Sequence, residues 1–219
     1  MKSRSDRLTK HTAQLFPCAS LFVVTGIFFL DNHLSFAVER FLRDGSSFGL
    51  RTAHIPDLLL PFVLILSVSF LAVRRVRIRR FGEDAYSAFC LLGAAVLPFS
   101  FLVKTALKPL FGRIETRVWL KNPLPPGLQW FHPSGGHSGF PSGHMMVLTA
   151  LAVAFWLYFP KPGGKCLLLL PLMGAVLIIT NYHFLTDVVA GAYFGLAVTS
   201  TTAFLLEENA HWSKRCKDC

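Results

Sequence analysis

The stretch 85-AYSAFCLLGAAVLPFSFLV-103 carries no charged residue over a length that crosses a bilayer as one helix. In the whole chain of 219 residues, 53% are hydrophobic, only 16% are charged and 21 are phenylalanine, and the mean hydropathy is +0.48. Soluble domains carry roughly 25% charged residues. The composition therefore indicates that lipid is the main solvent of this protein.

Six apolar segments follow one another along the chain, and lipid forces each to satisfy its own backbone hydrogen bonds as a helix. The sequence therefore predicts an all-α fold: a six-transmembrane-helix bundle forming a single domain over 1–219, with its core at about 15–206. The first segment lacks a small-residue cleavage site and five more follow, so we expect a retained helix and not a signal peptide. The predicted spans are 12–30, about 55–73, 85–103, about 142–159, 166–182 and 188–206.

Basic residues give the chain a net charge of +10 and gather in short blocks between the apolar segments. This pattern is typical of membrane proteins and argues against a nucleic-acid partner. Six crossings place four blocks on one side, and the positive-inside rule makes that side the cytoplasm. The blocks are the N-terminus, a loop at 74-RRVRIRR-80, a short turn at 160–165 and the C-terminal tail. Residues 31–54, about 104–141 and 181–187 then face the opposite side.

The stretch 33-HLSFAVERFLRDG-45 has apolar residues at helical spacing, namely Leu34, Phe36, Ala37 and Phe41. It predicts an amphipathic helix that lies on the membrane surface or, equally, one that packs on the bundle. Among five cysteines, Cys18, Cys90 and Cys166 fall in or beside apolar segments and are expected to act as small hydrophobes. The terminal pair Cys216 and Cys219 is weak evidence for zinc or redox chemistry.

Positive charge also occurs on the predicted outer side, in 108-KPLFGRIETR-117. Lysine and arginine at helix ends usually extend along the membrane interface. Outer positive charge opposes the topology rule, however, and guanidinium groups match the geometry of phosphate. We therefore expect Lys108, Arg113 and Arg117 to bind a phosphate group.

Two further pieces lie at the same predicted membrane level. Ser142 and Gly143 precede the fourth span, so their N–H groups form an anion site at a helix N-terminus, although Ser142 also fits a plain N-cap. His144 follows in the first turn. His183 and Asp187 are four residues apart, which places them on one helix face at the start of the sixth span. One histidine could attack phosphorus while the other protonates the leaving oxygen.

The motifs K-x-x-F-G-R at 108–113, P-S-G-H at 141–144 and H-x-x-x-D at 183–187 together resemble the type 2 phosphatidic acid phosphatase family. That family shares its core with vanadium haloperoxidases. The resemblance extends over about 15–206 and includes 182-YHFLTDVVAGAYFG-195. It implies a six-helix membrane bundle with a metal-independent phosphatase site and no cofactor.

The resemblance also implies a role for each matching residue. His183 would be the nucleophile that forms a phosphohistidine, His144 the general acid, and Asp187 the group that orients His183. Lys108, Ser142 and Gly143 would hold the phosphate. The implied enzyme is a membrane lipid phosphatase, which we expect at the outer face of a bacterial inner membrane.

The sequence departs from the family pattern at two positions. The first motif usually has Arg-Pro seven residues after its lysine, where Glu115 and Thr116 stand here, and the third motif usually has arginine six residues before its histidine, at Leu177. Two usual phosphate-binding arginines are therefore absent. Either Arg113 and Arg117 replace them, or the substrate differs, or the protein is a weak or inactive enzyme.

Three other functions fit the same residues. A phosphotransferase would pass the phosphoryl group to a second lipid, and a non-catalytic protein would only bind an anionic lipid. A zinc enzyme would use ligands from the set His132, His137, His144, His183 and Asp187, although the loop gives these no fixed spacing. The headgroup also stays open among phosphatidic acid, phosphatidylglycerol phosphate, undecaprenyl diphosphate and lipid A phosphates, and the sequence predicts no oligomeric state.

Overall fold

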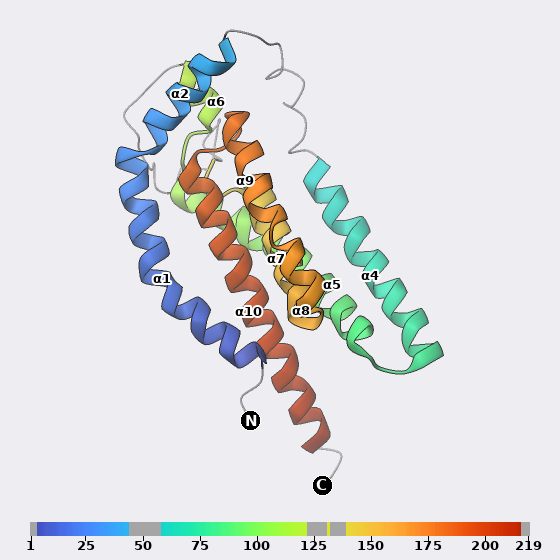
Figure 1. Cartoon of the computed structure of the whole chain (residues 1–219). Helices are drawn as coiled ribbons and strands as arrows, with labels where there is room; N and C mark the ends of the chain where they lie inside the picture. The colour runs from blue at the N-terminus through green and yellow to red at the C-terminus, as the bar shows by residue number, and fades with distance from the viewer. Residues whose placement is uncertain (1–3, 44–57, 122–130, 132–138, 216–219) are drawn as a thin grey trace.

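The structure is a computed structural model that describes residues 4–43, 58–121, 131 and 139–215. The described residues form helices and no strand, which confirms the all-α prediction. Both termini lie at one end of the bundle, and α2 and α6 lie at the other (Figure 1). The helices are α1 (Arg4–Phe29), α2 (Asp31–Arg43), α4 (Leu59–Phe81), α5 (Ala85–Phe111), α6 (Thr116–Lys121), α7 (Gly143–Tyr158), α8 (Pro160–Cys166), α9 (Leu169–Ile179) and α10 (Leu185–Arg215).

Five helical segments are long and apolar enough to cross a membrane, and α7 adds a shorter apolar helix of 16 residues. The five are α1, α4, α5, the segment Pro160–Ile179 that joins α8 to α9, and Leu185–Asn209 of α10. These six segments correspond to the six predicted spans. The alternating directions of the helices in Figure 1 fit a chain that crosses six times.

Several predicted loops are helical, and the predictions for them were wrong. The basic stretch 74–80 continues α4 to Phe81, and 160–165 forms most of α8 with Pro160 at its first position. In the loop expected from about 104, the first residues belong to α5, and a later part forms α6. Arginine and lysine are good helix formers and proline suits a first helical turn, so charge alone does not end a helix.

The ends of α5 explain how the chain enters this helix and how it turns towards Arg113 after it. Asp84 caps the helix, because its side chain accepts the Ser87 N–H while the Ser87 hydroxyl accepts the Asp84 N–H. At the other end, Gly112 adopts a left-handed conformation with φ 52° and donates its N–H to Lys108 O. Glycine takes this conformation without steric cost, and the turn leads directly into Arg113.

The core of the bundle lies where α7 packs between α5 and α10. Its buried side chains include Leu92 and Val96 of α5, Ala150 and Ala154 of α7, and Val198 of α10. The small residues of α7 let its neighbours approach closely. This close packing sets the distance between the start of α7 and the start of α10.

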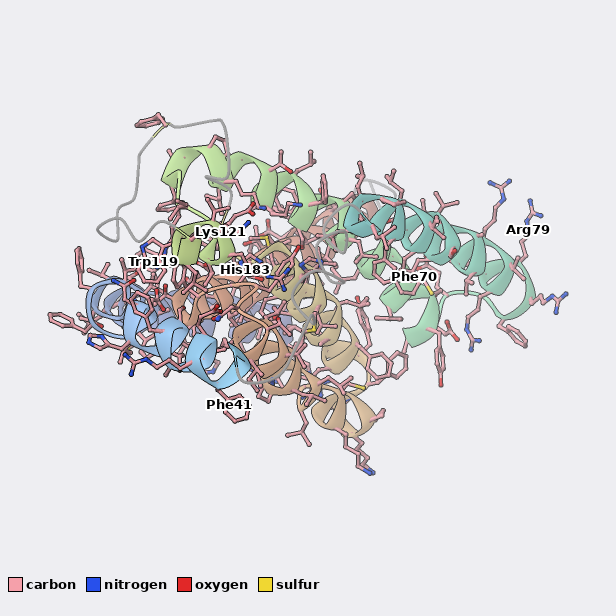
Figure 2. The ribbon with its side chains drawn as sticks, turned by 90° about the horizontal axis from the view of Figure 1, so that it is seen from above. Phe41, Phe70, Arg79, Trp119, Lys121 and His183 are labelled. Carbon is pink, nitrogen blue, oxygen red and sulfur yellow. The ribbon has the colours of Figure 1, made fainter. Side chains whose placement is uncertain are left out.

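Helix α2 covers the end of the bundle opposite the termini. Its Phe36 ring lies 5.0 Å from Trp119 of α6, so one part of the helix packs on the fold. Phe41 is 80% exposed and points outward in Figure 2, which looks onto this end. The predicted helix at 33–45 is therefore present through Arg43, it packs on the bundle, and it also shows an exposed apolar side chain.

Candidate phosphate-handling site

Two histidines from distant parts of the chain, His144 and His183, both pack against the ring of Tyr182. The His144 ring lies 5.7 Å from the Tyr182 ring, and the His183 ring lies 5.2 Å from it, both nearly perpendicular to it. The Ser142 N–H also donates to Asp187 O at 3.0 Å, which ties the start of α7 to the start of α10. The structure thus brings together the second and third predicted motifs.

His183 lies in the turn between α9 and α10, and not on the helix as the sequence predicted. Its N–H donates to Leu177 O at 3.2 Å, which holds the turn against the end of α9. Asp187 lies in the first turn of α10, where its Oδ2 accepts the Phe184 N–H at 3.1 Å. Asp187 therefore caps the helix while it faces His183. The turn, and not an i,i+4 helix face, produces the pair.

The His183 Nδ1 lies 3.6 Å from Asp187 Oδ2. This separation is longer than a hydrogen bond. The His183 side chain is 7% exposed, and Asp187 is fully buried. A carboxylate on the Nδ1 side directs the Nε2 atom away from Asp187, and catalytic contacts of this kind often shorten only when substrate binds.

The N-terminus of α7 has the predicted form. Ser142 is the N-cap and accepts the Met145 N–H at 3.4 Å, and Gly143 begins the helix. The aliphatic stem of Lys104 packs across Gly143, where a Cβ atom would overlap the Lys104 Cδ. Lys104 is one turn before Lys108 on α5. Lys104 was not predicted from the sequence, although its spacing from Lys108 is a helical one.

Two of the three predicted cations lie on α5 and α6. Lys108 lies in the last turn of α5 and interacts electrostatically with Glu115 and Asp187. Arg117 donates to Thr180 O at 3.1 Å, and its guanidinium lies 4.9 Å from the Tyr182 ring centre. Burial lowers the pKa of Arg117 from its usual value, while Tyr182 and Glu115 oppose the shift. An arginine still stays charged near neutral pH.

Leu177 stands where the family usually has a phosphate-binding arginine. It is buried in an apolar cluster with Met145 and Val188, directly below the His183 turn. Arg117 instead reaches the neighbouring Thr180 and Tyr182 from α6. A guanidinium is therefore present beside this turn, but a different helix supplies it.

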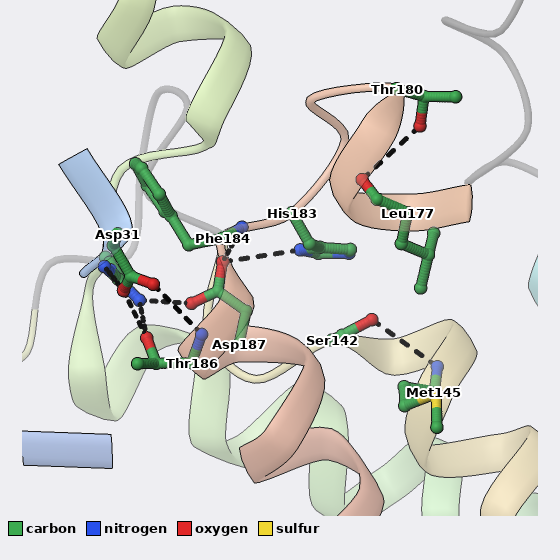
Figure 3. A network of polar contacts seen from close by, with 10 residues as sticks. Asp31, Ser142, Met145, Leu177, Thr180, His183, Phe184, Thr186 and Asp187 are labelled. Carbon is green, nitrogen blue, oxygen red and sulfur yellow. Dashed lines mark hydrogen bonds and ion pairs between the residues drawn. The ribbon is translucent and has the colours of Figure 1, made fainter. Parts of the chain in front are cut away.

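Arg113 is 3% exposed and is bound to two carboxylates. Its Nη1 donates to Asp187 Oδ1 at 2.5 Å and to Thr186 Oγ1 at 2.7 Å, and its Nη2 donates to Asp31 Oδ2 at 2.6 Å (Figure 3). Burial works to lower the pKa of Arg113, but the two carboxylates outweigh it and hold the pKa above its usual value. That Arg113 binds phosphate stays a prediction.

Asp31 and Thr186 were also not predicted from the sequence. A signal for Asp31 existed, because this carboxylate directly follows a predicted membrane span. Thr186 gave no signal, since threonine is common in helices of this kind. Its role depends on partners more than 70 residues away in sequence.

A cavity of about 340 Å³ lies between α4, α7 and α9, next to the site. His144 is the one polar residue among its described lining residues. The others are Leu58, Leu59, Phe62, Val147, Leu148, Leu151 and Met173. The imidazole is therefore in contact with both a polar site and an apolar space.

Of the histidines considered as zinc ligands, His132 and His137 lie outside the described residues. Within the described part of the chain, no three His, Cys, Asp or Glu side chains lie close enough together to hold a metal ion. Cys216 and Cys219 also lie outside the described residues.

Comparison with known proteins adds a family match. The family model of the PAP2 superfamily matches residues 87–210, which contain all three motifs. The chain is also 33% identical over 110 residues to a lipid A 1-phosphatase of Rhizobium johnstonii. That alignment covers 49% of this chain and 43% of the relative, so it spans less than half of either protein. No solved structure matches.

Proposed function

The chain belongs to the PAP2 superfamily, and we propose that it is a membrane phosphatase that hydrolyses a phosphate ester or diphosphate of a lipid. The main support is the pair of histidines, His144 and His183, on either side of Tyr182, with Asp187 beside His183. Phosphoryl transfer through a covalent enzyme intermediate needs a nucleophile, an acid for the leaving group and a residue that orients the nucleophile. These three residues match the three needs.

In the proposed reaction, the Nε2 atom of His183 attacks phosphorus, and the bond between phosphorus and the lipid oxygen breaks. His144 gives its proton to the departing oxygen. Water then attacks the phosphohistidine, the N–P bond breaks, and the now neutral His144 takes a proton from that water. Inorganic phosphate leaves, and both imidazoles return to their starting protonation states.

The phosphate group would lie among Lys108, Arg117 and the first N–H groups of α7. Ser142 and Gly143 supply the helix N-terminus, whose dipole favours an anion. Arg117 supplies one guanidinium and Lys108 one ammonium group. Neutralising the charge on the transferring phosphoryl group is the main catalytic effect in this class of reaction.

The cavity beside His144 favours a lipid over a soluble phosphate. Its described walls are apolar except for His144 itself, and it lies between three apolar helices, α4, α7 and α9. An acyl chain in this cavity would leave the headgroup next to the imidazole. The similarity to a lipid A 1-phosphatase makes a lipid A phosphate one candidate to test among the other lipid phosphates.

We further propose that the site faces the outside of a bacterial inner membrane. The basic stretches near both termini and at the C-terminal end of α4 lie at the end of the bundle opposite α2 and α6 (Figure 1). By the positive-inside rule, the end with the basic stretches faces the cytoplasm. A cysteine introduced at exposed Phe131 should then react with a membrane-impermeant thiol reagent in intact cells.

The experiment that tests the function measures phosphate release from a panel of lipid phosphates by purified protein in detergent. We expect turnover by the wild type, and loss of turnover in His183→Ala and His144→Ala. The matched control is His11→Ala, because His11 is exposed on α1. A phosphate label on His183 that is stable in alkali and lost in acid would identify the phosphohistidine. Wild-type turnover in His183→Ala would refute the nucleophile assignment.

Two additions to the assay separate the alternatives. A strong chelator should leave the rate unchanged, and loss of activity with recovery on adding zinc would instead support a metal enzyme. A second lipid alcohol in the mixture would show whether the phosphoryl group goes to water or to lipid. Phosphorylated second lipid as the main product would make the protein a phosphotransferase.

A further inference from the structure

Asp31 is a fully buried carboxylate in the first turn of α2, next to the proposed catalytic residues. Its Oδ1 accepts the Thr186 N–H at 3.1 Å. Its Oδ2 accepts a hydrogen bond from Arg113 Nη2 at 2.6 Å and a short hydrogen bond from the Thr186 hydroxyl. Asp31 therefore holds the start of α10 and Arg113 at the same time (Figure 3).

Arg113 extends this contact to Asp187. One of its nitrogens, Nη1, donates to both Asp187 Oδ1 and Thr186 Oγ1, and its guanidinium stacks 4.3 Å from the Phe184 ring centre. The other carboxylate oxygen, Asp187 Oδ2, then faces the His183 Nδ1. The chain of contacts runs from Asp31 through Arg113 to Asp187 and ends at the imidazole.

Stability alone gives a weak reason for such a network. It places two carboxylates and one guanidinium in the interior, where burial raises the pKa of Asp31 against the opposing effect of Arg113. Burying ionised groups is costly, and apolar residues of similar size often stabilise a fold equally well. An ionic network does, however, fix the orientation of each group through directed hydrogen bonds.

We propose that Asp31, acting through Arg113 and Thr186, is a positioning residue for the phosphatase reaction, because it fixes the Asp187 carboxylate against His183. This inference rests on the proposed function. It also gives Arg113 a different principal role from the predicted one, since both its Nη atoms hold carboxylates. Lys108 and Arg117 are then the cations that meet the phosphate group.

The test uses Asp31→Asn, which keeps the shape and the acceptor oxygen but removes the charge. We expect kcat to fall about ten- to a hundredfold while KM changes by less than about threefold, since the substrate contacts stay intact. The matched control is Asp6→Asn. Asp6 pairs with Lys10 at 3.6 Å near the start of α1, far from the site, and its removal should leave kcat unchanged.

A second pair of variants covers the case in which Asp31→Asn does not fold. Thr186→Val removes the hydroxyl that joins Arg113 to Asp31, and Thr186→Ser restores it. We expect Thr186→Val to lower kcat and Thr186→Ser to recover it, with equal melting temperatures for the two. Wild-type kcat in Thr186→Val, or a rise in KM alone, would overturn the proposal.

An activity-independent measurement separates this inference from the proposed function. Diethyl pyrocarbonate should modify buried His183 slowly in the wild type and faster in Asp31→Asn, as read by mass spectrometry of the His183 peptide. If the wild type releases no phosphate from any lipid, the proposed function fails. The modification rate alone then tests whether Asp31 positions Asp187 against His183. An equal rate in both proteins would then overturn this inference.

Discussion

Two backbones come close together where α10 crosses the start of α7, and this contact yields a quantitative prediction for Gly191→Ala. Gly191 and Gly195 are four residues apart in 191-GAYFG-195 and face α7. A Cβ atom at Gly191 would lie 2.5 Å from Ser142 O and 3.1 Å from Met145 Cβ. Small residues at this spacing let two helices pack backbone to backbone.

An alanine at position 191 cannot be accommodated by a side-chain rotation, because the nearest atom is a backbone oxygen. Overpacking of this kind costs about 1–3 kcal/mol of unfolding free energy. The helices must separate by a large part of an ångström, which breaks the 3.0 Å hydrogen bond from Ser142 N to Asp187 O. A misplacement of 1 Å at reacting groups lowers a rate by about a hundredfold.

We therefore expect Gly191→Ala to lose stability and about two orders of magnitude in kcat. Denaturant unfolding in mixed micelles measures the first, and phosphate release from the best lipid substrate measures the second. Gly195→Ala, one turn deeper against Met146 O, should lose similar stability but less activity. Gly164→Ala is the control, because no atom lies within 4 Å of its Cβ position.

The outcomes distinguish the packing of the two helices from its effect on the catalytic residues. Wild-type stability in Gly191→Ala would refute the close approach of α7 and α10. Lost stability with unchanged kcat would leave the packing argument intact, but it would refute the argument that this crossing sets the distance between His144 and His183.

Three further predictions concern residues around the site and at the opposite end of the bundle. Tyr182→Leu should lower kcat more than Tyr182→Phe, because only the phenyl ring keeps the contacts to both histidines and to Arg117. Lys108→Gln and Arg117→Gln should each lower kcat/KM by about ten- to a hundredfold in the phosphate-release assay, the loss of one charge-assisted hydrogen bond. Asp84→Ala should lower the melting temperature at neutral pH, since Arg77 and the Ser87 N–H lower the pKa of Asp84 to about 2. Because the pKa of Asp84 is lower in the folded state than in the unfolded chain, where it is about 4, the ionised carboxylate stabilises the fold above pH 4. This stabilisation is lost as the pH falls towards 2, so the difference in melting temperature should shrink over this range. A difference that stays constant down to pH 2 would contradict the assignment.

Much of the bundle follows from the sequence, because a membrane span depends on local composition. The segment 85–103 predicted α5, and the other apolar segments predicted the remaining crossings. The errors lie at the helix ends and in the short helix α6. Arg74 to Arg80 continue α4, since their long side chains favour helix and reach polar surroundings without breaking backbone hydrogen bonds.

The site divides in a similar way. The motif residues Ser142, His144, His183 and Asp187 were found because they lie close together in short patterns, and the structure places them in one region. Asp31 was missed because its partners lie 82 and 155 residues away. A contact of that kind is fixed by how α1, α2 and α10 pack, which no local pattern shows.

The two missing arginines call for different explanations. Leu177 packs with Met145 and Val188, so Leu177→Arg would bury an unpaired charge, and we expect it to destabilise the fold by several kcal/mol instead of raising activity. Glu115 is half-buried and acts electrostatically on Lys108 and Arg117, the two cations proposed to meet phosphate. Glu115→Gln removes a negative charge from beside an anion site, so kcat/KM should rise. A fall in kcat/KM at unchanged stability would show that Glu115 takes part in the reaction, and the charge balance proposed for this site would then be wrong.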